Sequence, residues 1–235
     1  MGGADAGVGE FPVDMGCCGY VVIYSIIPAA RRRQPLNTYP RLYIFSALAG
    51  DACKGIHVSD GIQIRRLQVI GEREIRGLSE VLIDCVEGGA SVSFMLPMTV
   101  EKARAFWSKS AESAARGERM IFVAEDGSGD IVGTVQVVLD LPENQPHRGD
   151  ISKMLVHRKA RRLGVGAALM AAAEQGALSA GKTVLVLDTA SDDAERLYRR
   201  QGWQFSGTIP DYALMPDGAY CATHFFYKVL TPRPS

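Results

Sequence analysis

The spacing of apolar side chains divides the chain into an irregular first part and a regular remainder. Residues 1–60 combine glycine, proline and short apolar bursts, with neither a helical nor a strand period. We therefore expect residues 1–60 to be an irregular, poorly ordered N-terminal extension whose role the sequence does not reveal. From residue 61 apolar positions recur regularly, which predicts one folded domain over residues 61–231 and a short tail at residues 232–235.

Within the predicted domain, alternating apolar positions mark strands, and apolar residues three or four positions apart mark helices. Thr99 is suited to cap a helix, because its hydroxyl can accept a backbone N–H of the first turn. In chain order, the expected elements are a strand at residues 62–67, helices at 72–86 and 99–117, strands at 120–124, 130–139 and 150–156, a helix at 160–180, a buried strand at 183–187, a helix at 192–200, and strands near 203–205 and 223–229. This order predicts an α/β fold: a single domain with a mixed central β-sheet flanked by helices.

Composition agrees with a soluble globular domain and excludes several classes of protein. Of 235 residues, 47% are hydrophobic and 22% are charged, which excludes a wholly disordered chain, a collagen and a coiled coil. The 26 basic and 26 acidic side chains balance, whereas a dedicated nucleic-acid binder usually has a basic excess. The same balance argues against non-specific docking to anionic membranes. We therefore expect no nucleic-acid partner and no stable membrane association.

Cysteine and histidine spacing indicates neither disulfides nor a metal. The five cysteines are an odd number, and no two of them have the spacing of a zinc knuckle or a redox motif. The four histidines show no close pairing that suits a metal ligand set. We expect free thiols in a reducing cytoplasm, and no metal site.

The longest apolar run, residues 17–30, is shorter than the roughly 20 residues that a membrane span needs. Gly19 and Pro28 interrupt it, and acidic rather than basic residues precede it, the reverse of a secretory signal. A weak interfacial anchor, with the basic triplet Arg31-Arg32-Arg33 following the apolar stretch, stays open as an alternative. The run therefore leaves the expectation of a cytoplasmic protein unchanged.

A glycine-rich loop between a strand and a helix carries the chemistry. Gly164 and Gly166 remove side chains where the backbone could approach a ligand closely. The first N–H groups of a helix have no partner within it, so they can bind phosphate oxygens. Four basic residues add positive potential to the loop: Arg158, Lys159, Arg161 and Arg162. This pattern predicts a pyrophosphate cradle, and a glycine-containing helix start beside a solvated basic patch is the alternative.

Two other phosphate motifs fit the loop less well. The P-loop pattern G-x-x-x-x-G-K-[ST] does not occur, which makes a P-loop nucleotidase a poor match. Gly164-x-Gly166 lacks the third glycine of the dinucleotide-binding fingerprint, and it falls late in the chain. An NAD-dependent oxidoreductase is therefore a weak alternative.

Several blocks in the second half of the chain together resemble the GNAT superfamily of acyl-CoA-dependent N-acyltransferases. The matching segments are Arg161-x-x-Gly164-x-Gly166 after the strand at 153–156, the strand at 183–188, the block at 194–203 with the pattern A-x-x-L-Y-x-x-x-G-W, and the closing segments at 209–212, 216–218 and 226–228. The resemblance covers residues 62–231. It implies a GNAT-like fold and transfer of an acetyl group from acetyl-CoA to an amine.

Within that superfamily, the chain looks most like the tabtoxin-resistance type of small acetyltransferase. Four segments carry this likeness: residues 88–95, Leu187-Asp188-Thr189, Pro210-x-Tyr212 and Pro216-Asp217-Gly218. It implies a small-molecule acceptor such as an amino-acid-like toxin or antibiotic, and hence a role in toxin or antibiotic resistance. The chain departs from the family where Arg158 replaces a frequent proline, Arg162 a frequent glycine and Ser191 a frequent asparagine.

The resemblance assigns acetyl-CoA to one group of residues. Backbone groups of Met154, Leu155 and Val156 would bind the pantetheine arm, and one of their N–H groups would polarise the thioester carbonyl. Residues expected to hold the pyrophosphate are Arg161, Arg162, Leu163, Gly164, Val165, Gly166 and Ala167. Ser191 would make a side-chain contact to the cofactor, which its departure from asparagine puts in question. Tyr198 would reach the sulfur as general acid, and a core tyrosine is its alternative.

The resemblance assigns the acceptor amine to a second group. Asp150 and Asp188 match acidic residues with substrate-binding or catalytic roles, with Asp150 acting through water or orienting the amine, since an ordinary carboxylate is a weak base. The alternatives are a solvated strand-end charge for Asp150 and a helix cap for Asp188. Tyr212 would line the acceptor pocket, and an exposed aromatic residue is its alternative.

The sequence therefore predicts an acetyl-CoA-dependent N-acetyltransferase for a small-molecule amine, by direct attack in a ternary complex. A protein or peptide N-acetyltransferase and a non-catalytic acyl-CoA-binding module stay open. We expect a monomer or homodimer. The sequence does not name the acceptor amine.

Overall fold

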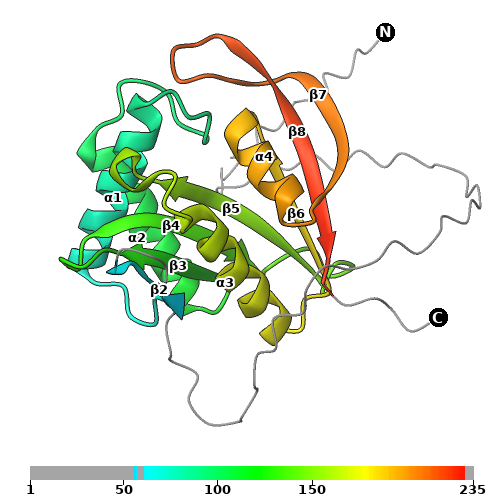
Figure 1. Ribbon diagram of the computed structural model, residues 1–235, viewed down its shortest axis with the longest axis horizontal. Coiled ribbons are helices and arrows are strands. Elements are labelled where there is room, and N and C mark those ends of the chain that lie inside the picture. Colours follow the sequence, from blue (N-terminus) through cyan, green and yellow to red (C-terminus); the bar gives the residue numbers. More distant parts are fainter. Residues whose placement is uncertain (1–55, 58–60, 231–235) are drawn as a thin grey trace, which may run out of the picture. The chain divides into compact units, whose positions relative to one another are not determined.

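A computed structural model describes residues 56–57 and 61–230, in which eight strands form one sheet (Figure 1). The strands are β1 (Ile56–His57), β2 (Gln63–Arg66), β3 (Arg119–Glu125), β4 (Ile131–Val138), β5 (Arg148–Val156), β6 (Val184–Thr189), β7 (Gln204–Leu214) and β8 (Tyr220–Val229). Their order is β1-β2-β3-β4-β5-β6-β8-β7. Strands β5 and β6 pair in parallel and the other neighbours pair antiparallel, which confirms the mixed α/β sheet.

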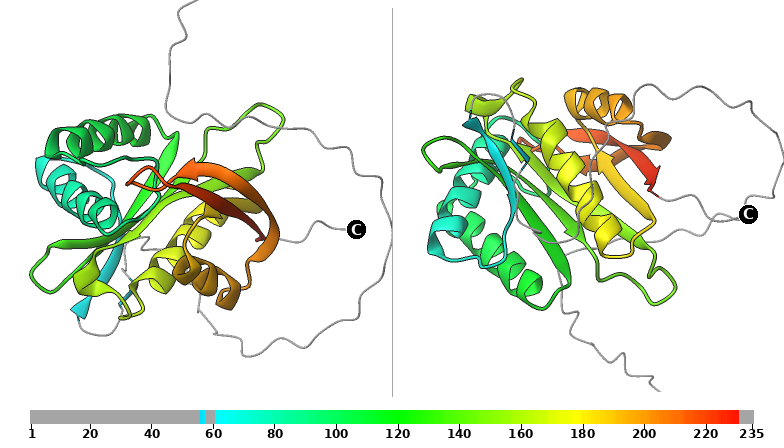
Figure 2. Two further views of the ribbon diagram at one scale, coloured as in Figure 1. Left: turned by 90° about the horizontal axis from the view of Figure 1, so that it is seen from above. Right: turned by 60° about the horizontal axis from the view of Figure 1, so that its bottom comes forward.

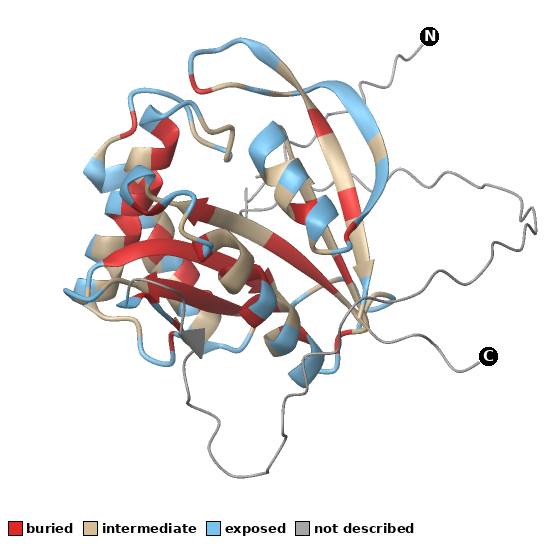
Figure 3. Ribbon diagram, in the orientation of Figure 1, coloured by how far each residue is buried: buried red, intermediate tan, exposed pale blue. Residues whose placement is uncertain are grey.

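Helices cover both faces of the sheet (Figures 1 and 2). The helices are α1 (Glu72–Glu87), α2 (Val100–Ala115), α3 (Val165–Ser179) and α4 (Asp192–Arg200). Apolar side chains of α1 and α2 form one core with β3, and those of α3 and α4 form a second core on the opposite face. Strands β3 and β4 are buried along most of their length between these layers (Figure 3).

Local capping explains where the first two helices begin. The hydroxyl of Thr99 accepts the backbone N–H of Lys102 at 3.2 Å, which confirms the predicted cap of α2. At α1 the N–H of Gly71 donates to the Glu74 carboxylate at 3.0 Å, which satisfies a backbone donor at the first turn.

Three expected boundaries were wrong. The helix expected at 160–180 begins only at Val165, because residues 158–160 form a single 3-10 turn and Arg162 and Gly164 adopt left-handed backbone angles. Strand β7 runs to Leu214, far beyond its expected end near residue 205, whereas β8 only begins slightly earlier than expected, at Tyr220. The proline-containing segment around Tyr212 is therefore part of β7, where the pairing with β8 is interrupted between Ile209 and Ala213.

The sheet opens between its two parallel strands. Register pairs join Arg148 to Val184, Gly149 to Leu185 and Asp150 to Val186, and the strands diverge beyond these three pairs (Figure 1). On its other side β5 has an irregularity opposite β4, at Lys153. This opening positions the site described below.

Two further expectations concern the whole chain. The predicted tail and the apolar run lie outside the described residues, as does the extension apart from Ile56 and His57. Within the described ranges, no helix is long and apolar enough to cross a membrane. In the same ranges, no cluster of three or more His, Cys, Asp or Glu residues is placed to hold a metal ion.

Candidate active site

The loop before α3 forms a cradle of backbone N–H groups. Gly164 is the N-cap of α3 and has φ +81, a left-handed conformation that glycine adopts without strain. The N–H of Ala168 donates to the Gly164 carbonyl at 3.1 Å. Among the described residues, the N–H groups of residues 163–167 have no acceptor, as expected at a helix N-terminus. Such a cradle can bind an anion along the helix dipole.

Gly166 lies where three elements meet. A Cβ atom at this position would lie 3.1 Å from Cδ2 of Leu197 on α4, and 3.8 Å and 3.9 Å from Sδ of Met154 and Cγ2 of Val156 on β5. The absence of a side chain therefore keeps the cradle in close contact with the end of β5. This arrangement supports the expected role of Gly166 near the cofactor.

The four basic residues of the loop are not equivalent. Arg158 is bound to Asp84 of α1 through its backbone N–H and its guanidinium. Lys159 pairs with Asp126 at 3.3 Å. Arg161 donates from Nε to the Val156 carbonyl at 3.2 Å. These contacts anchor the loop to its surroundings, so part of the basic charge is locally neutralised.

Arg162 is exposed and has φ +65. The left-handed region is strained for a residue with a Cβ atom, whereas glycine, which the resemblance to the family leads one to expect at this position, adopts it without strain. Arg162 retains its charge beside the cradle.

The end of β5 offers an unpaired backbone edge. β4 pairs with one edge, Thr134 with Leu155 and Gly133 with Val156. Because β6 has diverged, the second edge of Met154, Leu155 and Val156 has no strand partner in the described part of the chain. Its peptide groups are therefore available to a ligand between β5 and β6, as expected for a pantetheine arm.

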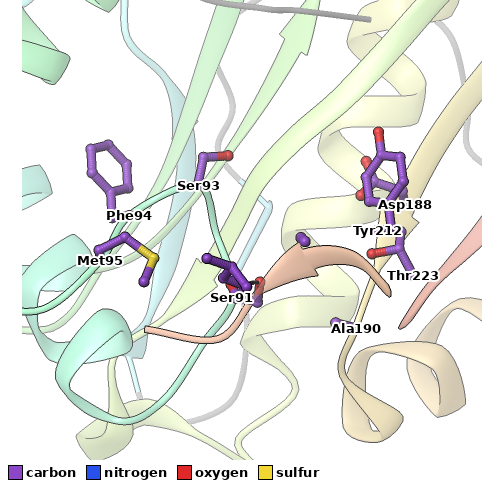
Figure 4. Close-up of a pocket in the computed structure, with 10 residues that line it drawn as sticks. Ser91, Ser93, Phe94, Met95, Asp188, Ala190, Tyr212 and Thr223 are labelled. Atoms are coloured by element: carbon purple, nitrogen blue, oxygen red, sulfur yellow. Dashed lines mark hydrogen bonds between the residues drawn. The ribbon is translucent and has the colours of Figure 1, made fainter. Parts of the chain in front are cut away.

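A cavity of about 330 Å³ lies beside the end of β6. Figure 4 shows Asp188, Tyr212 and Thr223 on one side of it and Phe94 and Met95 on the other. The remaining lining residues are Ser91, Ser93, Ala190, Ala213 and Leu214. Asp188 gives this cavity an acidic group among hydroxyl and apolar surfaces.

Asp150 is the second carboxylate of the site. It pairs with Val186, two residues before Asp188, so both carboxylates lie on the same face of the sheet. Asp150 is only 6% exposed, and Arg148 donates to its Oδ2 at 3.2 Å, whereas its Oδ1 is buried without a partner. This burial contradicts the alternative of a solvated strand-end charge.

Burial raises the pKa of both carboxyl groups. For Asp150 the charge of Asp188 raises the pKa further, whereas Arg148 and Lys182 lower it. For Asp188 burial raises the pKa, and the charge of Lys153 acts against that rise. Both groups are therefore stronger proton acceptors than an exposed aspartate.

Asp188 does not cap α4, which contradicts its alternative role. The cap is Ser191, whose hydroxyl accepts the N–H of Ala194 at 3.4 Å. The Ser191 hydroxyl therefore caps a helix, a role that the sequence analysis did not assign to it; its contact to the cofactor stays a prediction. Asp188 is left to line the cavity.

Tyr198 lies on α4 and is 4% exposed. Its ring packs 6.0 Å from the rings of Trp203 and Phe226, so Tyr198 belongs to the core as its alternative required. Burial and then the charge of Asp188 raise the pKa of its phenol, which keeps it protonated at neutral pH. The core position leaves open a role as hydrogen-bond donor.

Tyr212 was expected either to line the acceptor pocket or to be an exposed aromatic residue, and both descriptions apply. It is 41% exposed, and it also lines the cavity. Its ring packs edge-to-face on Phe225 at 5.5 Å, which fixes its position.

The segment after α1 is tied across the cavity to β7 and its turn. Ser91 donates to the Leu214 carbonyl at 3.0 Å, and the thiol of Cys221 donates to the Ser91 hydroxyl at 3.6 Å. The N–H of Leu96 donates to the Pro216 carbonyl at 3.0 Å. These bonds hold the segment after α1 against β7 and its turn beside the cavity.

Comparison with known proteins agrees with this geometry. The model of the acetyltransferase (GNAT) family matches residues 93–203. Over these residues the chain is therefore similar to GNAT acetyltransferases. The match includes the cradle, the diverging strands, Asp188 and Tyr198.

Solved structures of known proteins have the same fold as the described part of this chain. A ribosomal-protein-alanine N-acetyltransferase from Brucella melitensis has 23% identity and a TM-score of 0.58, over 71% of this chain and 98% of that chain. The yncA protein of Salmonella typhimurium, solved with its cofactor acetyl-CoA, has 17% identity and a TM-score of 0.61, over 74% of this chain and 97% of that chain. At these identities the likeness concerns the fold.

A curated relative matches a shorter stretch. The N-terminal acetyltransferase complex ARD1 subunit homolog of Dictyostelium discoideum is 47% identical over 53 residues. That match spans 23% of this chain and 25% of the relative.

Sequence reasoning missed Lys153 as a candidate site residue. Its Nζ donates to the hydroxyl of Ser93, a cavity residue, at 3.1 Å. The motif around Lys153 predicted the strand. The direction of its side chain, however, depends on an irregularity in β5 that the residue pattern does not predict. A lysine in the middle of an otherwise apolar strand end was the signal that could have found it.

Proposed function

We propose that this protein transfers the acetyl group of acetyl-CoA to the amine of a small molecule. The observation that carries the proposal is the opening between β5 and β6, with the N–H cradle at its α3 end and the acidic cavity at the end of β6. In this arrangement acetyl-CoA, bound from the cradle, and an amine, bound in the cavity, would come together between β5 and β6. The arrangement supports direct attack in a ternary complex, because one opening serves both.

The described residues fit acetyl-CoA. The cradle of residues 163–167 would hold the pyrophosphate, and the close approach at Gly166 leaves the backbone accessible. The unpaired edge of residues 154–156 would hold the pantetheine arm, with an N–H polarising the thioester carbonyl. When bound, acetyl-CoA supplies an acetyl group activated as a thioester.

Asp188 and Asp150 would serve the amine. Asp188 lines the cavity and can accept a hydrogen bond from the acceptor ammonium, which orients its nitrogen. Asp150, with its raised pKa and an unpartnered Oδ1, can take up the proton through water. The amine then attacks the thioester carbon; the new C–N bond forms as the C–S bond breaks.

Tyr198 would stabilise the leaving sulfur. Its phenol has a raised pKa, so complete proton transfer to a thiolate, whose acid form has a pKa near 8.5, is unfavourable. A protonated phenol still donates a strong hydrogen bond to an anion. We therefore assign Tyr198 the role of hydrogen-bond donor to the leaving sulfur. The thiolate would take up its proton only after the attacking nitrogen has released one.

The size and surroundings of the cavity favour a small acceptor. A volume of about 330 Å³ lies at the lower end of the usual range for small-molecule sites. The bonds from Ser91 and Leu96 hold the segment after α1 against the β7–β8 region, which would restrict access for an extended peptide. An amino-acid-like toxin or antibiotic is within this size class, and resistance would be its biological consequence.

A protein N-terminus is the second candidate acceptor. The 53-residue match to an N-terminal acetyltransferase complex subunit homolog favours it. A peptide acceptor would need the segment at residues 91–96 to release its bonds to β7. Preference for peptides over free amines in the assay below would support this candidate.

The cysteines and the placement of the site residues bear on the compartment and the oligomeric state. The described thiols Cys85 and Cys221 are free, which suits a reducing cytoplasm. All proposed site residues lie on one chain, so a monomer would suffice and a homodimer would carry two independent sites.

Two measurements test the proposal. Isothermal titration with acetyl-CoA should show binding, and thiol release from acetyl-CoA should accompany turnover of at least one amine in a panel of amino acids, aminoglycosides and short peptides. Absence of binding at millimolar acetyl-CoA would contradict the proposal. Binding without turnover of any amine would instead support a non-catalytic acyl-CoA-binding module.

A further inference from the structure

Lys153 occupies a strained position in β5. Its φ is +49, a region that residues with a Cβ atom rarely adopt. The strain coincides with the shift in register between β4 and β5, where Gln136 pairs with Ser152 and Thr134 with Leu155. Such irregularities re-aim a side chain and are frequent beside active sites.

The re-aimed side chain contacts residues that line the acceptor cavity. Nζ of Lys153 lies 3.1 Å from the Ser93 hydroxyl, 5.9 Å from the ring centroid of Phe94 and 5.6 Å from that of Phe106. Ser93 and Phe94 line the cavity. Aromatic faces hold an ammonium group while displacing part of its water, so its attraction for an anion increases.

Opposite charges therefore meet at one small cavity. Asp188 lines it from β6, and the charge of Lys153 acts on Asp188 strongly enough to oppose the effect of burial. A purely cationic acceptor would meet repulsion from Lys153. An acceptor that carries both an amine and a carboxylate would satisfy both groups.

We propose that Lys153 is a specificity-determining residue that binds the carboxylate of a zwitterionic, amino-acid-like acceptor, while Asp188 orients its amine. This inference rests on the proposed acetyltransferase function and narrows its substrate class. Amino-acid amides, whose carboxylate is masked, lose the contact to Lys153. Polycationic acceptors such as aminoglycosides are poor substrates for the same reason.

The test compares free amino acids with their amides, leucine with leucinamide among several pairs, by thiol release from acetyl-CoA. Amidation also lowers the basicity of the amine. The quantity compared between variants is therefore the kcat/KM for the free acid divided by the kcat/KM for its amide. We expect the wild type to favour the free acid. Lys153→Met should lower the ratio about 10- to 100-fold, mainly through KM, as expected for loss of a charged hydrogen bond.

Two further variants separate specificity from structure. Lys153→Arg keeps the charge and should retain most of the preference. Lys109→Met removes an exposed lysine of α2 and should leave the ratio unchanged. The affinity for acetyl-CoA, measured by titration, should be equal in all variants.

Each outcome decides the matter. An unchanged ratio in Lys153→Met, or a wild type that prefers every amide to its acid, overturns the role of Lys153 while the acetyltransferase activity stands. Failure to bind acetyl-CoA or to acetylate any acceptor contradicts the proposed function, and this inference with it.

Discussion

The carboxylate of Asp188 lies on the same sheet face as that of Asp150, and its charge adds to burial in raising the pKa of Asp150. Raised carboxyl pKa values mean that folding favours the protonated form. The stability contribution is therefore fully present below the unfolded pKa, near 3.8, and it is lost as pH rises through the folded value. At neutral pH the Asp150 carboxylate destabilises the fold.

Asp150→Asn should separate stability from activity. At pH 7 we expect the variant to be more stable by about 1 kcal/mol, a rise in Tm of roughly 2–4 °C, because a buried charge is removed. The gain should vanish as pH falls below the ordinary aspartate range. Acetyl transfer should drop by about 10²-fold, in the range for a general base. Thermal unfolding between pH 4 and 8 and initial rates measure both effects.

Asp140→Asn, at an exposed loop position, is the matched control and should change neither quantity. A variant of Asp150 that is less stable at pH 7 would show that Arg148 compensates its charge fully.

Tyr198→Phe should slow turnover while preserving the fold. The phenyl ring keeps the packing on Trp203 and Phe226, and the hydrogen bond to the leaving sulfur is lost. We expect kcat to fall about 10- to 100-fold, with the Kd for acetyl-CoA unchanged. Because the phenol stays protonated, the wild-type rate should show no loss attributable to Tyr198 up to pH 10. An undiminished kcat would remove Tyr198 from the mechanism.

Gly166→Ala should weaken acetyl-CoA binding without unfolding the protein. The new Cβ would press on Leu197 at 3.1 Å and narrow the cradle. Alanine also favours the helix, by up to about 1 kcal/mol, so overall stability should be nearly unchanged. Titration should show a Kd at least about tenfold higher, about 1.4 kcal/mol of binding free energy.

Gly127→Ala is the control for this prediction, since a Cβ there meets no atom within 4 Å. Equal acetyl-CoA affinities in the two variants would mean that the ligand does not approach α3 closely.

Substitutions of Arg162 should reveal its backbone strain. Glycine tolerates φ +65, so Arg162→Gly should be neutral to stabilising, by up to about 1 kcal/mol after its greater unfolded-state entropy is considered. Arg162→Val should destabilise by about 1–2 kcal/mol, because β-branched residues suit this region least. Urea unfolding compares the two. Equal stabilities would show that the loop relaxes readily around this residue.

The sequence predicted the fold class and the order of elements because apolar periodicity reports burial on sheet and helix faces. It did not predict the start of α3 at Val165. The helical pattern of apolar residues extends back to Ala160, but the left-handed backbone of Gly164 prevents the helix from beginning before Val165. The length of β7 escaped prediction because that edge strand is largely exposed and lacks alternating burial.

The candidate site was predictable where a motif specifies backbone, as at Gly164 and Gly166, and less so where side chains choose partners. The ion pairs of Arg158 with Asp84 and of Lys159 with Asp126 join residues far apart in the chain, and the sequence carries no sign of them. Lys153 was missed for the same reason: its direction depends on the pairing of β5 with β4.

The opening between β5 and β6 has a consequence for the lifetime of the protein. Three residue pairs join these strands, so the part of the sheet containing β6, β7 and β8 is held to the rest by few backbone bonds. A ligand lying in the opening would contact both parts and stabilise the native state by mass action. Amide exchange in β6 should then slow when acetyl-CoA is added. If acetyl-CoA is that ligand, as proposed above, the amount of folded protein in a cell would follow the supply of acetyl-CoA: the protein would persist when acetyl-CoA is abundant and be degraded faster when it is scarce.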